Sequence, residues 1–201
     1  MMGCSPGDTE CDPDEKPARQ VTLTTGFWLG QTEVTQGAYR SVMNTNPSHF
    51  KGDTLPVESV SWEEAGRYCK AIGGRLPSEA EWEWAARGGT TTARYDSTLD
   101  RIAWYDKNSD AKTHPVGQKL ANGYRLFDML GNVWEWTADW YKASYEGESL
   151  EVDPAGPPGG EFRVLRGGSW GDDPSFVRAS GRNRNLPSNR LSIIGFRCRG
   201  E

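Results

Sequence analysis

Residues 163–198, RVLRGGSWGDDPSFVRASGRNRNLPSNRLSIIGFRC, constrain what this chain can fold into more than any other segment. The two ends, residues 163–170 and 195–198, are rich in arginine, glycine and aromatic residues. The residues between them follow neither the helical period of 3.6 nor the strand period of 2, which predicts an ordered loop. Irregular segments on a fixed scaffold are where folds commonly place binding surfaces.

The same segment carries residues that can fix an irregular backbone. We expect the guanidinium groups of Arg178, Arg182 and Arg190 to hold loop carbonyls, each through several hydrogen bonds. Pro174 and Pro187 restrict the backbone torsions of the loop. The side chains between these residues are then free to face solvent.

The composition agrees with a loop-rich fold. The chain has 201 residues, enough for one domain spanning residues 1–201, with only 35% hydrophobic residues but 9 Trp, 24 Gly and 12 Pro. Disordered chains lack such tryptophans, so an aromatic core joined by loops is expected. The net charge of −5 argues against a nucleic-acid partner. We expect no membrane span and no signal peptide, and therefore favour a cytoplasmic monomer.

Regular elements are predicted at only a few places. Ser61 with Glu64, and Ser78 with Glu81, form capping boxes that begin helices. The predicted helices are residues 61–73, 79–87 and 36–43, the predicted strands are 21–23, 27–29 and 163–165, and a surface loop is expected over 141–160.

Three strings carry a family resemblance: LPVESVSWEEAGRYCKAIGGRLPSEAEWEWAARGG (55–89), GYRLFDMLGNVWEWTADWY (123–141) and RVLRGGSW…GFRC (163–198). With GFWLGQTEVTQGAY (26–39), they resemble the formylglycine-generating-enzyme, or sulfatase-modifying factor, family over nearly the whole chain. The resemblance implies an α+β domain with a C-type lectin-like fold of the formylglycine-generating-enzyme type, rich in loops and with few short helices and strands.

The catalytic residues of that family do not carry over to this chain. The oxygenase chemistry needs two copper-binding cysteines after GGSW, and there is no cysteine between Trp170 and Cys198. A second branch binds iron through three histidines, whereas this chain has only His49 and His114, both beside loop prolines. We therefore expect neither copper nor iron and favour a protein that is not an enzyme. The alternative is an oxidoreductase or accessory maturation enzyme that uses other residues.

The cysteines divide into two pairs. Cys4 and Cys11 flank a turn-rich segment and could bridge or remain free thiols. The resemblance implies a disulfide between Cys69 and Cys198, whose positions match those of a bridged family pair. A buried reduced pair is the alternative, favoured by a cytoplasmic location.

The residue types in the loop suggest what it does. Residues 171–194 contain no Lys, Glu, Gln, Met or Trp. Those five types cannot be reached when only the adenines of an AAC or AAT asparagine codon change. This pattern, at the end of such a fold, resembles the variable proteins of diversity-generating retroelements. We call residues 170–194 the variable segment, and expect it to bind an unknown protein or small-molecule ligand.

Trp170 and Phe176 are expected as aromatic anchors of that surface, with packing in the core as the alternative for Trp170. The expected ligand-binding set is Trp170, Gly171, Asp172, Asp173, Ser175, Phe176, Gly181, Leu186, Ser188, Leu191, Ser192 and Ile193.

The string DMLGNVWEW suggests a metal site. The resemblance implies one structural calcium ion held by the side chains of Asp128 and Glu135 and by the carbonyls of Gly131 and Val133. Calcium takes six to eight oxygen ligands, so water or further carbonyls would complete the site. The alternative is that Glu135 only caps the turn. A second calcium site of the family, near residues 100–110, is not expected here.

Overall fold

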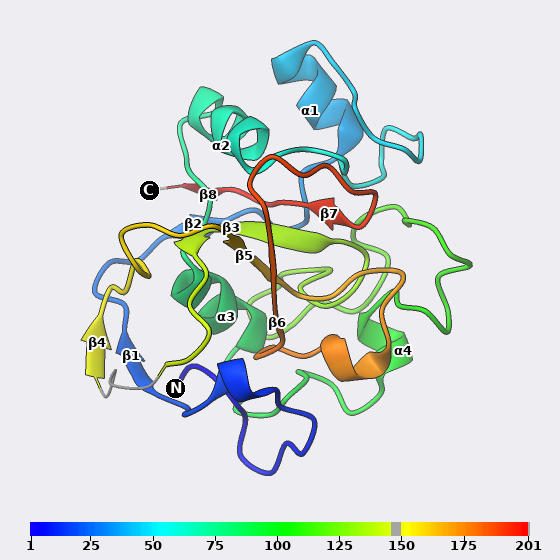
Figure 1. Ribbon diagram of the computed structural model, residues 1–201. Helices are drawn as coiled ribbons and strands as arrows, with labels where there is room; N and C mark the ends of the chain where they lie inside the picture. Colours follow the sequence, from blue (N-terminus) through cyan, green and yellow to red (C-terminus); the bar gives the residue numbers. More distant parts are fainter. Residues whose placement is uncertain (146–149, 201) are drawn as a thin grey trace.

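The computed structural model describes residues 1–145 and 150–200. Short helices and strands are joined by long irregular connections (Figure 1). The helices are η1 (Pro13–Glu15), α1 (Gln36–Met43), α2 (Trp62–Ala71), α3 (Glu79–Arg87), α4 (Leu99–Ile102) and η2 (Pro174–Phe176). The strands are β1 (Gln20–Thr22), β2 (Trp28–Leu29), β3 (Trp134–Trp140), β4 (Leu150–Val152), β5 (Arg163–Arg166), β6 (Arg182–Asn185), β7 (Ile194–Gly195) and β8 (Arg199–Gly200).

A four-stranded sheet with the order β6-β5-β3-β7 organises the molecule. β3 pairs antiparallel with β5, where Glu135 faces Arg166, and parallel with β7, where Trp134 faces Ile194. β5 and β6 pair antiparallel along their full length. Two smaller sheets join β1 to β4 and β2 to β8. The variable segment therefore supplies one edge strand, β6, and the first residue of the other, β7.

The core lies on both sides of this sheet. In Figure 1, α1 and α2 lie above β3 and α3 lies below it. The upper core contains Tyr39, Trp136 and Phe196, and the lower core is built around Trp82 and Met129. Trp82, Trp134 and Trp136 are fully buried. The aromatic core expected from the composition is thus present.

The helices begin where the sequence predicts. The Ser61 hydroxyl accepts a hydrogen bond from the Glu64 N–H, and the Glu64 carboxylate accepts one from the Ser61 N–H. Ser78 and Glu81 form the same reciprocal pair at α3. Both capping boxes satisfy backbone donors that would otherwise lack partners. α1 and α3 have the predicted bounds, and α2 lies within the predicted range.

Two predictions about regular structure were wrong. The variable segment is not purely loop, because it contains η2 and β6 as well as β7. β6 was missed because its sequence, RNRN, is polar on both faces of an edge strand. β3 was not predicted either, since five of its seven residues are buried and no alternation marks a strand. The loop expected over 141–160 contains β4, and its residues 146–149 lie outside the described residues.

Both cysteine pairs are disulfide-bonded, so no cysteine of the chain is a free thiol. Cys4 joins Cys11, with 5.8 Å between their Cα atoms. Cys69 on α2 joins Cys198 just before β8, with 5.4 Å between their Cα atoms. The second bridge links positions 129 residues apart and ties α2 to the C-terminal strand.

Candidate functional site

Buried arginines hold the backbone of the variable segment. Arg166, on β5, is fully buried and donates to the carbonyls of Ala179, Ser180 and Gly181 at 2.5–3.0 Å. It also pairs with the buried carboxylate of Glu83 on α3. One guanidinium group therefore anchors three successive carbonyls of an irregular turn, as its planar set of donors allows.

Arg178 and Arg182 fix the segment from the other side. Arg178 donates to Glu15 at 2.6 Å and to Asp8 at 3.0 Å, and Arg182 donates to Glu79 at 2.6 Å. Burial alone would raise the pKa of Glu15, but the hydrogen bonds and charge of Arg178 lower it below its usual value. Both arginines are buried.

The partners of these arginines differ in part from those expected. Arg178 and Arg182 do bind carbonyls, those of Ser175 at 2.5 Å and Asp14 at 2.6 Å, but carboxylates supply their charge-assisted bonds. Arg190 is exposed and binds one loop carbonyl, that of Ser188 at 3.1 Å, while it pairs with Glu64 at 3.0 Å. The carboxylate partners lie 100 residues or more away in sequence, where no local pattern points to them.

The predicted binding residues fall into three groups by burial. Phe176, Leu191 and Leu186 have exposed fractions of 42%, 41% and 38%, large for apolar side chains. The exposed members are Gly171, Asp173, Phe176, Leu186, Ser188 and Leu191, the half-buried members are Trp170, Asp172, Ser175, Ser192 and Ile193, and Gly181 alone is buried.

Gly181 was wrongly placed among the displayed positions. A Cβ atom there would lie 2.7 Å from the Phe176 carbonyl oxygen and 3.2 Å from that of Arg178. Gly181 also offers its own carbonyl to Arg166. Its position belongs to the fixed scaffold, and only glycine leaves room for the turn.

Asp172 also has a structural role. Its carboxylate accepts hydrogen bonds from the Ser169 N–H at 2.9 Å and from the Ser169 hydroxyl, closing the turn after GGS. Burial raises the pKa of Asp172, against the lowering effect of the Ser169 hydrogen bonds. Asp173 differs, because it is exposed and caps η2 through the Ser175 N–H at 2.9 Å.

Trp170 is partly packed and partly accessible. Its indole Nε1 donates to the Ser192 carbonyl at 3.1 Å, and its ring meets Phe50 edge to face at 5.6 Å between centroids. The hydrogen bond to Ser192 joins the two ends of the variable segment. Trp170 is half-buried and packs on Phe50, and its role as a ligand anchor stays a prediction.

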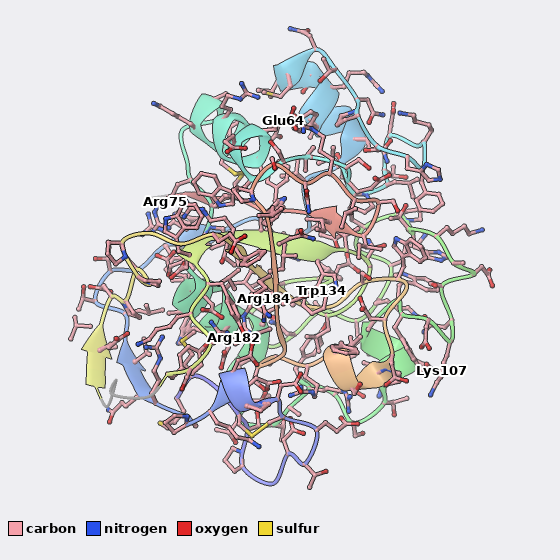
Figure 2. The ribbon with its side chains drawn as sticks, viewed as in Figure 1. Glu64, Arg75, Lys107, Trp134, Arg182 and Arg184 are labelled. Carbon is pink, nitrogen blue, oxygen red and sulfur yellow. A yellow bond between two sulfur atoms is a disulfide. The ribbon has the colours of Figure 1, made fainter. Side chains whose placement is uncertain are left out.

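The exposed residues lie at both ends of β6 rather than in one pocket. In Figure 1 the orange-to-red segment runs from η2 at the lower right, along β6, to a loop near α2, where the Pro187 carbonyl accepts from the Trp62 N–H. Figure 2 labels Arg184, which lies midway along this path on β6. The displayed surface is therefore an elongated face.

A shallow cavity of about 380 Å³ lies at the lower end of that face. Phe176 and Arg184 line it together with Tyr141 and Asp14. Arg184 lies over the Tyr141 ring at 4.5 Å and donates to its hydroxyl at 2.9 Å. Sequence reasoning missed Tyr141 and Arg184, because the pair forms only in the folded sheet, where β5 lies between β6 and β3.

The two histidines lie in irregular segments of the chain. The ring of His114 stacks on Trp104 at 3.8 Å, with its Nε2 2.7 Å from the Ser109 carbonyl. His49 packs edge to face on Phe50. These contacts give each histidine a packing role.

Two of the predicted calcium residues, Asp128 and Glu135, lie in a buried acidic region. Asp128 accepts from the Gly117 N–H at 2.6 Å through Oδ2, while its buried Oδ1 has no hydrogen-bond partner. Glu135 accepts from the Trp82 indole at 2.7 Å and from Arg197 at 2.7–2.9 Å. Burial and the nearby Asp128 and Glu135 charges hold the pKa of Glu33 well above its usual value.

Sequence reasoning missed Glu33, which accepts from the Asn132 side chain at 2.7 Å and the Val133 N–H at 3.2 Å. Three buried carboxylates thus surround Arg197. The unpartnered Asp128 oxygen and this excess of negative charge fit an oxygen-bound cation. Glu135 fits less well than expected, because protein donors already bind both of its oxygens.

Comparisons with known proteins agree with this fold and divide on function. The sulfatase-modifying factor enzyme 1-like domain model matches residues 1–200. A formylglycine-generating enzyme from Streptomyces coelicolor is 38% identical over 178 residues, covering 79% of this chain and 55% of that enzyme. This chain therefore spans about half the length of that relative.

No helix in the described part of the chain is long and apolar enough to cross a membrane.

Two solved structures match over the whole chain. Variable protein 1 of Treponema denticola has a TM-score of 0.86 at 31% identity, covering 100% of this chain and 93% of that one. PvdO from Pseudomonas aeruginosa has a TM-score of 0.88 at 29% identity, covering 100% and 90%. The similarity extends to enzymes and to a variable protein alike. The α+β fold of the formylglycine-generating-enzyme type is confirmed, and the chain belongs to the sulfatase-modifying factor enzyme 1-like domain family.

Proposed function

We propose that this chain is a ligand-binding domain without catalytic activity, which presents the exposed face of residues 170–194 to a protein or small-molecule partner. One observation carries the proposal. The exposed residues Gly171, Asp173, Phe176, Leu186, Ser188 and Leu191 lie on a backbone held from beneath by Arg166, Arg178 and Arg182. Such a backbone keeps its shape when the exposed side chains change.

Two further observations support this function over oxygenase chemistry. Every cysteine of the chain lies in a disulfide, so no thiolate is left to bind copper or attack a substrate thiol. The likeness to a variable protein covers the whole chain. Disulfides persist in oxidising compartments, so the two bridges favour such a location over the cytoplasm expected from the sequence.

The most direct test of diversification is the gene. We expect a reverse-transcriptase gene nearby and a second copy of the segment encoding residues 170–194, differing from the first only at template adenines. Sequencing the locus decides this. A locus without either element would leave a binding domain of fixed specificity.

The competing function is an enzyme of the same family, favoured by the 38% identity to a formylglycine-generating enzyme. Incubating the protein with copper, oxygen and a peptide containing Cys-x-Pro-x-Arg, followed by mass spectrometry, separates the two. We expect no formylglycine above a heat-inactivated control. Turnover would overturn the proposed function.

A structural calcium ion also fits the proposal. Asp128 would supply Oδ1, with the carbonyls of Gly131 and Val133 and the side chain of Glu135 as the further family donors. A divalent cation there would offset the buried carboxylates of Asp128, Glu135 and Glu33. It would stabilise the scaffold and take no part in ligand binding.

A further inference from the structure

A second feature of the molecule lies away from the variable segment, at the far end of β3. Asp139 has an exposed fraction of 4%, and its Oδ2 accepts a hydrogen bond from the Glu79 N–H at 2.7 Å, at the start of α3. Its Oδ1 accepts no hydrogen bond from the described residues, and none of their arginines or lysines lies within ion-pair distance. A buried carboxylate normally has such a partner.

Asp139 faces two adjoining cavities. One has a volume of about 560 Å³ and is lined by Arg19, Tyr145 and Arg182, among others. The other has about 410 Å³ and is lined by Arg75 and Arg199, among others. Both share Asp139, Asp153, Pro154 and Ala155. These volumes are typical of small-molecule sites. Figure 2 labels Arg182, which lines the first cavity, and Arg75, which lines the second.

Two arginines that line the larger cavity form ion pairs with glutamates. Arg19 pairs with Glu151 at 2.8 Å, and Arg182 pairs with Glu79 at 2.6 Å.

Two further charged groups line the same cavity. Asp153 accepts from the Thr24 N–H at 2.8 Å and from its hydroxyl, and Lys142 also has an interaction partner. Among the described residues that line this cavity, Asp139 is thus the buried carboxylate that has no cation paired with it, whereas Asp153 is exposed and bound by Thr24. The Trp140 side chain belongs to the same lining and adds apolar surface beside it.

We propose that this pair of cavities binds a small organic cation, an alkylammonium or alkylguanidinium group, with Asp139 as its counter-ion. The positive charge of the ligand would pair with the buried Asp139 carboxylate, whose Oδ1 accepts no hydrogen bond from the described residues. The apolar chain of the ligand would lie along Pro154, Ala155 and Trp140. This site is separate from the exposed face of the variable segment and does not depend on the function proposed for it.

The environment of Asp139 gives the site a pH dependence. Burial, together with the charges of Glu79 and Glu81, raises the pKa of Asp139 to about 7, against the lowering effects of the Glu79 N–H and Arg182. The charged groups around Asp139 are Glu79 and Glu81 on α3, Arg163 on β5, Arg182 on β6, and Arg19, Arg75, Lys142, Glu151, Asp153 and Arg199 in the cavity walls. A cation binds the ionised carboxylate, so binding strengthens as the pH rises through 7.

The test uses butylguanidinium and its neutral isostere butylurea, titrated into ¹⁵N-labelled protein and followed by amide chemical shifts. We expect saturable shifts at Asp139 and Gly156 with butylguanidinium only, and affinity about tenfold or more higher at pH 8.5 than at pH 5.5. A capped arginine peptide, titrated alongside, tells whether the cation can be a peptide side chain or must be a free molecule.

The variant Asp139→Asn keeps an oxygen for the Glu79 N–H and removes the charge. It should lose the binding, whereas Asp153→Asn, in the same cavity walls, should retain most of it. Equal binding of butylurea, or unchanged binding by Asp139→Asn, would overturn the proposal. If Asp139→Asn fails to fold, the ¹³C titration of the Asp139 carboxyl in the native protein decides. Butylguanidinium must lower that pKa, and an unchanged value overturns the site.

Discussion

At the scale of single residues, buried arginines bind backbone carbonyls that regular secondary structure would otherwise pair. Arg166, Arg178 and Arg197 are among the largest fully buried side chains, and each binds both a carboxylate and backbone carbonyls. An irregular backbone leaves carbonyls without ladder partners, and these guanidinium groups supply them. The sequence predicted that Arg178 would be buried, but it could not identify Asp8 and Glu15 as its partners.

Arg178 and Arg190 offer a matched comparison, since both lie in the variable segment and both pair with a glutamate. Arg178→Leu leaves Glu15 and Asp8 buried without their cation, and should lower the free energy of unfolding by about 3–5 kcal/mol. Arg190→Leu breaks an exposed pair with Glu64 and should cost less than about 1 kcal/mol. Urea unfolding of both variants measures the difference. Equal losses would show that the buried anchor is unimportant.

Substitutions at Gly181 and Gly171 distinguish a position of the buried scaffold from a position on the exposed face. Gly181→Ala places a methyl group 2.7 Å from the Phe176 carbonyl oxygen and should destabilise the protein by about 1–3 kcal/mol. Gly171→Ala meets no atom within 4 Å and should change stability by less than about 0.5 kcal/mol. Thermal unfolding of the two variants is the measurement. A larger effect at Gly171 would reverse the assignment of both positions.

At the scale of elements, the sequence predicted helices far better than strands. The capping boxes at Ser61 and Ser78 are local signals, and both helices begin there. β3 gave no such signal, because WEWTADW is covered on both faces and mixes aromatic with acidic residues. The burial of its acidic residues depends on partners from other parts of the chain, such as Arg197 for Glu135.

The junction between β3 and α3 should make stability depend on pH. The pKa of Asp139 is raised to about 7 in the folded protein, so the carboxyl favours folding most below its unfolded pKa, and that contribution is lost as the pH rises towards 7. Asp139→Asn does not titrate. The unfolding free energy of the variant, relative to the native protein, should therefore increase by about 2–3 kcal/mol between pH 5 and pH 8. Urea unfolding at both pH values checks this, and a constant difference would contradict it.

At the scale of the whole molecule, the N-terminal segment and the C-terminal third hold each other in place. Arg178 and Arg182 reach Asp8, Asp14 and Glu15, and the Cys69–Cys198 bridge closes a loop with a sequence separation of 129. The family resemblance gave the fold and that cysteine pair from sequence. The ion pairs across the chain could not be predicted, since each joins residues that only the folded backbone brings together.

Calcium should stabilise the whole fold if it binds beside Asp128. Chelation should lower the melting temperature of the native protein, because a ligand specific to the folded state is removed. Asp128→Asn should abolish the difference. It keeps an oxygen for the Gly117 N–H and suits the left-handed backbone at φ 53°. Glu135→Ala is a poorer test, since it also strips Arg197 of its partner. A melting temperature that changes with neither calcium nor chelator would show that the protein binds no stabilising calcium ion.

If the scaffold is fixed, the exposed side chains of residues 170–194 can be exchanged without loss of folding. A pair of display libraries tests this. One library varies the exposed positions Gly171, Asp173, Phe176, Leu186, Ser188 and Leu191, and the other varies the buried positions Val177, Ala179, Ser180 and Gly181. Protease resistance on the cell surface measures the folded fraction of each. We predict that most members of the first library stay folded, since surface changes typically cost within about 0.5 kcal/mol per site, and that most members of the second do not. Equal loss of folding in the two libraries would contradict the claim.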